Sequence, residues 1–140
     1  MKTLPASATD EQILQIARDW AEALAREDYE AAYNMTGHDP YYHWTPDLIR
    51  TVVRNYGGVE PLGDGSTCRV TPLDSAQGGP TPRHIVERRS DFARATGAQE
   101  VGSVWFDLPL DGEWSDLTVT FRIFREDDEL HLVLNEIHVF

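Results

Sequence analysis

Residues 117–125 read LTVTFRIFR, in which apolar and polar side chains alternate as far as Ile123. This alternation is typical of a β-strand that buries one face, because successive side chains of a strand point to opposite sides of the sheet. The buried face is predicted to consist of Leu117, Val119, Phe121 and Ile123. A hydrophobic core is therefore expected against one side of a sheet, with the polar side chains on the other.

Further strand-like segments fill the rest of the second half of the chain. They are short β-rich runs, separated by Gly, Pro and Asp clusters, at residues 67–73, 84–92, 101–108 and 130–140. Asp111-Gly112 and Asp127-Asp128 stand where hairpin turns are needed, so the last three strands are expected to form a meander. Residues 74–82, DSAQGGPTP, are too rich in Gly and Pro for regular structure and are expected to form a mobile loop.

The last predicted strand is apolar on both faces. One face carries Leu130, Leu132, Leu134, Glu136 and His138, and the other carries Val133, Asn135, Ile137 and Val139. Such a pattern is expected of a central strand, or of a sheet whose second face meets a partner subunit.

The first half of the chain predicts helices. Thr9 or Asp10 can cap the first helix, whose apolar stripe is formed by Ile13, Ile16, Ala17, Trp20 and Leu24. A shorter helix follows from about Tyr29 and ends near Gly37. Thr45-Pro46 starts a third helix, because Thr suits the cap and Pro suits the first helical position. Its buried side is Leu48, Ile49, Val52, Val53 and Tyr56, and Gly57-Gly58 ends it.

These elements predict a single α+β domain over residues 1–140, in which N-terminal helices pack on a curved, mostly antiparallel sheet. The formal net charge is −12, which disfavours nucleic acid as a partner and leaves a basic protein as a possible one. Cys68 is the single cysteine, and there is no apolar run long enough for a signal sequence or a membrane span. We therefore expect a cytoplasmic protein that does not associate with membranes.

Three segments resemble the nuclear transport factor 2-like superfamily, which includes SnoaL-like and ketosteroid isomerase-like proteins. They are WAEAL at residues 20–24, DYEAAY at 28–33 and LVLNEIHVF at 132–140. The resemblance implies a cone-shaped α+β fold of a bacterial protein, with a cavity between the helices and the concave face of the sheet and often a homodimer. It does not imply one function, because similar proteins include isomerases, dehydratases, cyclases, ligand-binding proteins, scaffolds and immunity proteins.

Catalysis in such a cavity would require a buried carboxylate or histidine, because burial moves the pKa toward the working pH. Glu136 and His138 are two apart on one strand, so they share a face, and His138 could act as a base that Glu136 orients. They could equally be polar residues at a sheet edge or a dimer interface. Asp91 is a further candidate, although Arg88 and Arg89 favour an ordinary ion pair there.

Aromatic side chains are the candidates for binding an apolar ligand. Tyr42, His43 and Trp44 precede the third helix and could form the mouth of a cavity, or could plug the open end of the core. Other aromatic candidates are Trp20, Tyr33, Tyr56, Trp105 and Phe121. The spacing of the five histidines matches no metal motif, and no phosphate-binding loop appears, so neither a metal nor a cofactor is predicted.

The sequence thus favours non-covalent binding of a small apolar ligand or a protein partner, in the cavity or on the sheet. One alternative is an immunity-type protein that neutralises a basic toxin, consistent with the acidic charge. The other is a small isomerase, dehydratase or cyclase that uses a cavity carboxylate or histidine. The lack of a recognisable catalytic set weighs against the enzyme.

The resemblance and the two-sided last strand together predict a homodimer. Sedimentation at high protein concentration checks this, because a homodimer doubles the mass of 15.8 kDa. A protein that sediments only as a monomer at the highest concentration would contradict the prediction.

Overall fold

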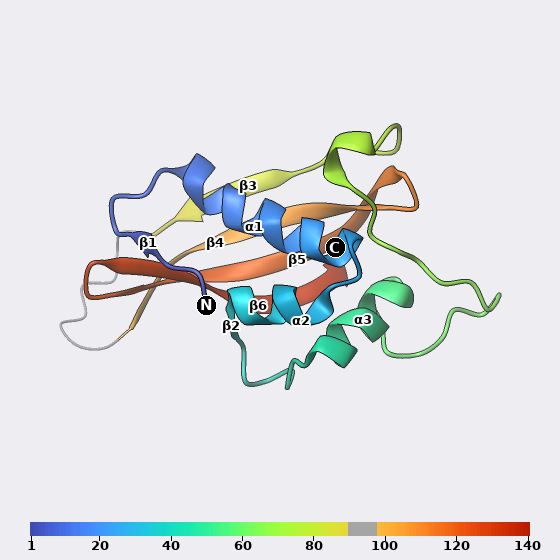
Figure 1. Ribbon diagram of the computed structural model, residues 1–140, viewed down its shortest axis with the longest axis horizontal. Helices are drawn as coiled ribbons and strands as arrows, with labels where there is room; N and C mark the ends of the chain where they lie inside the picture. The colour runs from blue at the N-terminus through green and yellow to red at the C-terminus, as the bar shows by residue number, and fades with distance from the viewer. Residues whose placement is uncertain (90–97) are drawn as a thin grey trace.

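The computed structural model describes residues 1–89 and 98–140. Three α-helices cover one face of a strongly curled, mostly antiparallel sheet, so the α+β prediction is confirmed (Figure 1). The strand order is β1-β6-β5-β4-β3, and β2 runs parallel to β6 at the same edge. Helix α1 packs on β3 and β4, α3 packs on β6, and α2 packs against both of the other helices (Figure 1).

The three helices begin where their capping residues predict. Helix α1 spans Asp10–Ala25, and the Thr9 side chain accepts from the Gln12 amide while the Gln12 side chain accepts from the Thr9 amide. Helix α2 spans Tyr29–Met35 and follows Asp28, whose carboxylate accepts from the Ala31 amide. Helix α3 spans Pro46–Arg54, with Thr45 as cap and Pro46 in the first position, as the sequence indicated.

The four long strands are β3 (His84–Arg88), β4 (Gln99–Leu110), β5 (Glu113–Glu126) and β6 (Glu129–Val139). The last three form the predicted antiparallel meander. Asp111 and Gly112 both have positive φ, as a tight hairpin turn with this twist requires, and Asp127 does the same at the second turn.

One strand assignment from the sequence is wrong, and two short strands were not predicted. Residues 67–73 form no strand. Within them only Val70 makes a β-bridge, to Leu110, and the 3-10 helix Leu73–Ser75 begins at their end. Pro72 lacks an amide donor, so this segment cannot sustain a ladder of hydrogen bonds. The sequence also missed the two-residue strands β1 (Leu4–Pro5) and β2 (Gly37–His38), which are too short to show any alternation.

The hydrophobic core lies between the helices and one face of the sheet. The predicted apolar stripe of α1 is fully or almost fully buried, and so are all four core-facing side chains of the segment quoted first, from Leu117 to Ile123. Burial of this many large apolar side chains is the main contribution to folding.

A bulge at Asn135 explains why β6 looks apolar on both faces. Phe121 pairs with Leu134, and the residue before it, Thr120, pairs with Glu136. Asn135 therefore has no partner in β5 and is an extra residue in β6. The side-chain alternation therefore changes phase at this point. Leu130, Leu132, Leu134 and Ile137 are consequently all buried on the helix side.

The bulge has consequences for both sides of the sheet. Glu136 and His138 point away from the helices, toward what we call the outer face of the sheet. The two-sided pattern of β6 is thus a product of the bulge, and it gives no separate support for a dimer. The homodimer remains a prediction that rests on the family resemblance alone.

The bulge is held by hydrogen bonds from side chains. The Thr120 hydroxyl accepts from the Glu136 amide at 3.1 Å and from the Asn135 side chain at 3.3 Å. The Trp44 indole N–H donates to the Asn135 carbonyl at 3.1 Å. These contacts satisfy polar groups that an extra residue would otherwise leave without partners.

We predict that Thr120→Val lowers the free energy of unfolding by about 1–3 kcal/mol, because the Glu136 amide loses its partner at a nearly buried position. Urea denaturation of both proteins measures the difference. Thr67→Val is the matched control, since Thr67 is exposed and should change stability little. Equal effects of the two substitutions would contradict the role given to Thr120.

Candidate functional site

The space between the helices and the sheet is filled by side chains. Trp20, Phe106 and Phe121 have no exposed surface, and the rings of Trp20 and Phe121 pack edge to face with centroids 5.4 Å apart. Two of the predicted ligand-binding residues, Trp20 and Phe121, are therefore core residues. Hollows of about 420 and 380 Å³ lie beside the β4–β5 turn, where Tyr56 lines one, and beside the β5–β6 turn. Among the residues that the structure describes, two other hollows border Glu136, one on the outer face and one at the end of α3.

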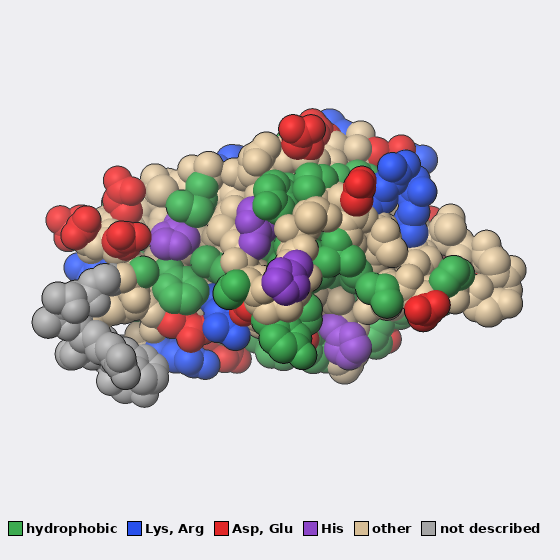
Figure 2. All heavy atoms as spheres, turned by 90° about the horizontal axis from the view of Figure 1, so that it is seen from below, with side chains coloured by type: hydrophobic (Ala, Val, Ile, Leu, Met, Phe, Trp, Pro, Cys, Tyr) green, Lys and Arg blue, Asp and Glu red, His purple; other side chains and the backbone are tan. Residues whose placement is uncertain are grey.

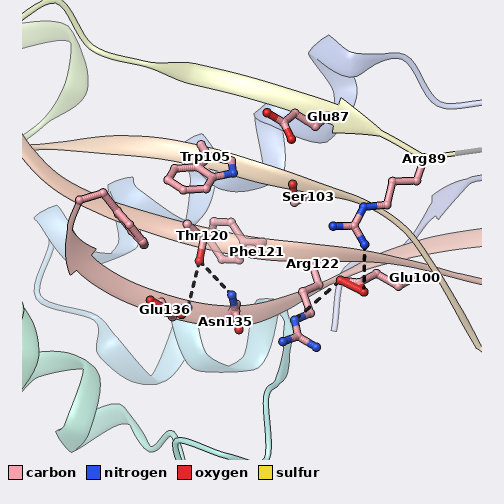
Figure 3. Close-up of a pocket in the computed structure, with 11 residues that line it drawn as sticks. Glu87, Arg89, Glu100, Ser103, Trp105, Thr120, Phe121, Arg122, Asn135 and Glu136 are labelled. Carbon is pink, nitrogen blue, oxygen red and sulfur yellow. Dashed lines mark hydrogen bonds and ion pairs between the residues drawn. The ribbon is translucent and has the colours of Figure 1, made fainter.

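The first of these, which we call the outer hollow, lies on the face of the sheet opposite the helices (Figure 3). Its volume is about 380 Å³. Its lining comes from β3, β4, β5, β6 and the residues beside them: Glu87, Arg89, Glu100, Ser103, Trp105, Thr120, Phe121, Arg122, Asn135, Glu136 and Phe140. The pairing of the strands, and not proximity in sequence, brings these side chains together.

One end of the outer hollow is an ion-pair network (Figure 3). Glu100 lies between Arg89 at 3.7 Å and Arg122 at 3.8 Å, and Arg122 also reaches Asp39 at 3.3 Å. Asp39 is 7% exposed and belongs to the segment after β2. The two arginines at this end are thus neutralised by two carboxylates.

The other end combines aromatic and acidic side chains. Trp105 packs against Phe140 with ring centroids 4.7 Å apart, and Phe140 is 51% exposed. Glu87 on β3 and Glu136 on β6 lie on either side of Trp105 (Figure 3). Neither of these glutamates has an ion-pair partner among the residues that the structure describes.

A second hollow, which we call the α3 groove, lies between α3, the turn after it and the end of β6. Its volume is about 480 Å³. It is lined mainly by apolar groups: Tyr42, Trp44, Leu48, Val52, Gly57, Gly58, Val59, Glu136, Ile137 and His138. Glu136 also lines the outer hollow, so the two hollows adjoin at this residue.

Hydrophobic side chains are exposed around this junction. Figure 2 shows them gathered across the middle of the molecule, with histidines among them and most charged groups toward the periphery. Val59 is 61% exposed beside the α3 groove, and Ile85 is 44% exposed beside Trp105 in the β3–β4 register. Burial, together with hydrogen bonding to Glu136, raises the pKa of Tyr42 and keeps its hydroxyl protonated.

The remaining predicted site residues are dispersed. Glu136 and His138 do share a face and both line the α3 groove, together with Tyr42 and Trp44. His43 is exposed, with a left-handed backbone, and Tyr33 stacks on His38 at 3.8 Å instead of lining either hollow. Asp91 lies outside the described residues.

Tyr56 belongs to a separate hydrogen bond. Its hydroxyl donates to Asp116, and this bond, with burial and the charge of Asp116, raises the pKa of Tyr56 to about 12. Tyr56 thus fastens the end of α3 to the start of β5.

Sequence reasoning missed several residues of the outer hollow, among them Glu87, Arg122 and Phe140. Strand alternation could have placed Arg122 on the outer face. No sequence signal shows which strands are neighbours, however, so the juxtaposition of Glu87 and Glu136 with Trp105 could not be predicted.

A buried carboxylate is present on the outer face, but it is already paired. Asp107 is 3% exposed and receives two bonds from the Arg83 guanidinium and one from the Thr118 hydroxyl at 2.6 Å. Burial acts to raise the pKa of Asp107, but these hydrogen bonds outweigh it and lower the pKa. Asp107 is therefore ionised and held in place, which suits a structural ion pair better than a general base.

The three arginines within residues 83–89 also form ion pairs. Arg83 pairs with Asp107, Arg88 with Asp10 at 2.9 Å, and Arg89 with Glu100.

No three His, Cys, Asp or Glu side chains in residues 1–89 and 98–140 lie close enough to hold a metal ion together. Within the same ranges, none of the helices has the length and apolar character needed to cross a membrane.

Comparison with known proteins adds no relative. No protein-family model matches the sequence, and neither curated proteins nor solved structures gave a significant match. The site must therefore be interpreted from its own geometry.

The environment of His84 predicts a pH-dependent stability. His84 stacks on Phe106 with centroids 3.8 Å apart. Burial lowers its pKa below the ordinary 6.5 more than the contact with Asp107 raises it, and Arg18 lowers it further. The unfolded chain then binds more protons than the folded one, so stability is highest above about pH 6.5 and falls as the pH drops through this value toward the folded pKa.

Urea denaturation between about pH 8 and about pH 5 measures this dependence, since the lowered pKa of Asp107 acts only at more acidic pH, below its ordinary 3.8. His84→Gln should flatten the dependence. An unchanged slope in His84→Gln would show that another group causes it.

Proposed function

We propose that this chain is a non-covalent binding protein whose partner is another protein, held on the outer face of the sheet around the end of β6. The observation that carries the proposal is the contrast between the two sides of the sheet. The helix side is packed with buried aromatic and aliphatic side chains. The outer side presents the outer hollow and exposed apolar groups, and the α3 groove adjoins this hollow at Glu136.

The composition of the outer surface supports a protein partner. Trp105 and Phe140 are aromatic groups of the kind that anchor protein interfaces, and Ile85 extends their apolar surface along the β3–β4 register. Carboxylates and polar side chains surround them, as in the rim of an interface. The net charge of −12 favours a basic partner through long-range attraction.

The family assignment belongs to the same proposal. A nuclear transport factor 2-like fold is compatible with helices on a curled sheet, and the superfamily accommodates scaffold and immunity proteins. An immunity-type protein that neutralises a basic toxin is one specific form of the proposed activity. The isomerase, dehydratase or cyclase alternative is less well supported, because the buried carboxylates Asp39 and Asp107 are each paired with an arginine.

The α3 groove favours a second candidate, binding of a small apolar ligand. Its aromatic and aliphatic lining, with Tyr42 and His138 as polar groups, is typical of a ligand site. A homodimer that used this groove would compete with such a ligand.

Panning a phage-displayed random peptide library on the folded protein tests the protein-partner proposal. We expect binders whose affinity falls about tenfold or more for the double variant Trp105→Ala/Phe140→Ala, since aromatic anchors commonly carry most of an interface's affinity. Tyr41→Ala is the matched control, because Tyr41 is 80% exposed and lines neither hollow.

Binders that retain full affinity for Trp105→Ala/Phe140→Ala would place recognition elsewhere and contradict the proposal. A library that yields no saturable binder would contradict it as well. Nuclear magnetic resonance spectra of each variant show whether it is folded before its binding is compared.

A further inference from the structure

We propose that the aromatic and acidic end of the outer hollow receives an arginine side chain of the basic partner, between Glu87 and Glu136 and against Trp105. This inference rests on the proposed function and specifies the chemistry of the partner. It follows from the arrangement of side chains across four neighbouring strands (Figure 3).

The strand register places the two carboxylates on opposite sides of the tryptophan. Trp105 on β4 pairs with Thr120 on β5, and Thr120 pairs with Glu136 on β6. On the other side, Glu87 on β3 pairs with Ser103, which shares the outer face with Trp105. The backbones of Glu87 and Glu136 are three strand spacings apart, about 14 Å, and are also offset by two residues, about 7 Å, along the strands. Both side chains line the hollow, so a cationic group against Trp105 would lie between them.

The chemistry of the floor and walls matches a guanidinium group. The face of an indole ring attracts a cation, most often arginine, and a carboxylate can accept two parallel hydrogen bonds from a guanidinium. The Ser103 side chain supplies a further oxygen atom beside Trp105. Arginine suits this site better than lysine, because its planar group can stack and form paired hydrogen bonds at once.

The two arginines of the hollow do not oppose this occupant. Arg89 and Arg122 lie at the other end, where Glu100 and Asp39 neutralise them. With these pairs formed, Glu87 and Glu136 leave the hollow with a net negative charge. A cation is thus attracted to the Trp105 end and an anion is not.

The site is open, which favours a side chain on a protein over a free small molecule. Ile85 at 44% and Phe140 at 51% remain exposed at its edge, where a partner's surface would cover them. A small amine would bury neither residue.

The experiment uses N-acetyl-arginine amide as the probe and follows the Trp105 indole N–H in spectra of the ¹⁵N-labelled full chain. We expect a saturable shift of this signal, weakened by added salt. N-acetyl-citrulline amide, which has nearly the same shape without the charge, should bind about tenfold more weakly. N-acetyl-lysine amide should lie between the two.

The variant Glu87→Gln/Glu136→Gln should lose about tenfold in affinity for the arginine probe while Trp105 and the fold are retained. Glu30→Gln/Glu60→Gln is the matched control: it changes the net charge equally, both glutamates are exposed, and neither lines a hollow. Equal binding of arginine and citrulline probes, or equal losses in the two double variants, would overturn the inference.

The outcome is separable from that of the proposed function. Library peptides that need Trp105 and Phe140 but contain no arginine, and that bind Glu87→Gln/Glu136→Gln normally, would overturn this inference and leave the protein-partner proposal intact. If the arginine probe binds as expected but the library yields no peptide binder, the protein-partner proposal is overturned and the arginine site is retained.

Discussion

The hydrogen bonds that hold Asn135 in a bulge are the contacts on which the rest of this structure depends. A regular strand points only every second side chain toward the core. In β6, however, Leu130, Leu132 and Leu134 before the bulge and Ile137 after it are all buried there. The extra residue changes the phase of the strand, so that Leu134 and Ile137 both face the helices. Thr120 and Trp44 stabilise this change by satisfying the displaced backbone groups.

The same change of phase determines which side chains form the surface that we propose for binding. Because Ile137 turns inward, Glu136 turns outward, where it borders both the outer hollow and the α3 groove. The helix side is then free to be packed by Trp20, Phe106 and Phe121. The interior that the family resemblance would make a cavity is filled, and the binding site that we propose lies on the outer face, where aromatic groups lie among carboxylates.

Much of the fold could be predicted from the sequence, since it depends on local signals. Each of these signals lies within a few consecutive residues, as the helix caps Thr9 and Thr45 and the alternation of residues 117–125 show. The short strands β1 and β2 and the bulge could not be predicted, because hydrogen bonds to distant segments create them. Residues 67–73 were wrongly predicted as a strand, because their composition is typical of strands. In the structure they pair with another strand only through the bridge of Val70 to Leu110.

The candidate site was predictable only in part. Alternation correctly put Glu136 and His138 on one face, and Tyr42 and Trp44 from the aromatic run before α3 line a groove beside them. The approach of Glu87 to Trp105 depends on strand order, which no pattern in a single sequence reveals. Aromatic residues such as Trp20 show the converse difficulty, because a buried ring and a ligand-binding ring have the same sequence signal.

The most direct test of this account is the register of β5 and β6, measured by nuclear Overhauser contacts between their backbones. The account predicts contacts of Phe121 with Leu134 and of Thr120 with Glu136, which leave Asn135 as the extra residue. A continuous register, with Thr120 opposite Asn135 and Val119 opposite Glu136, would turn Glu136 toward the helices. That result would contradict the placement of the binding surface on the outer face.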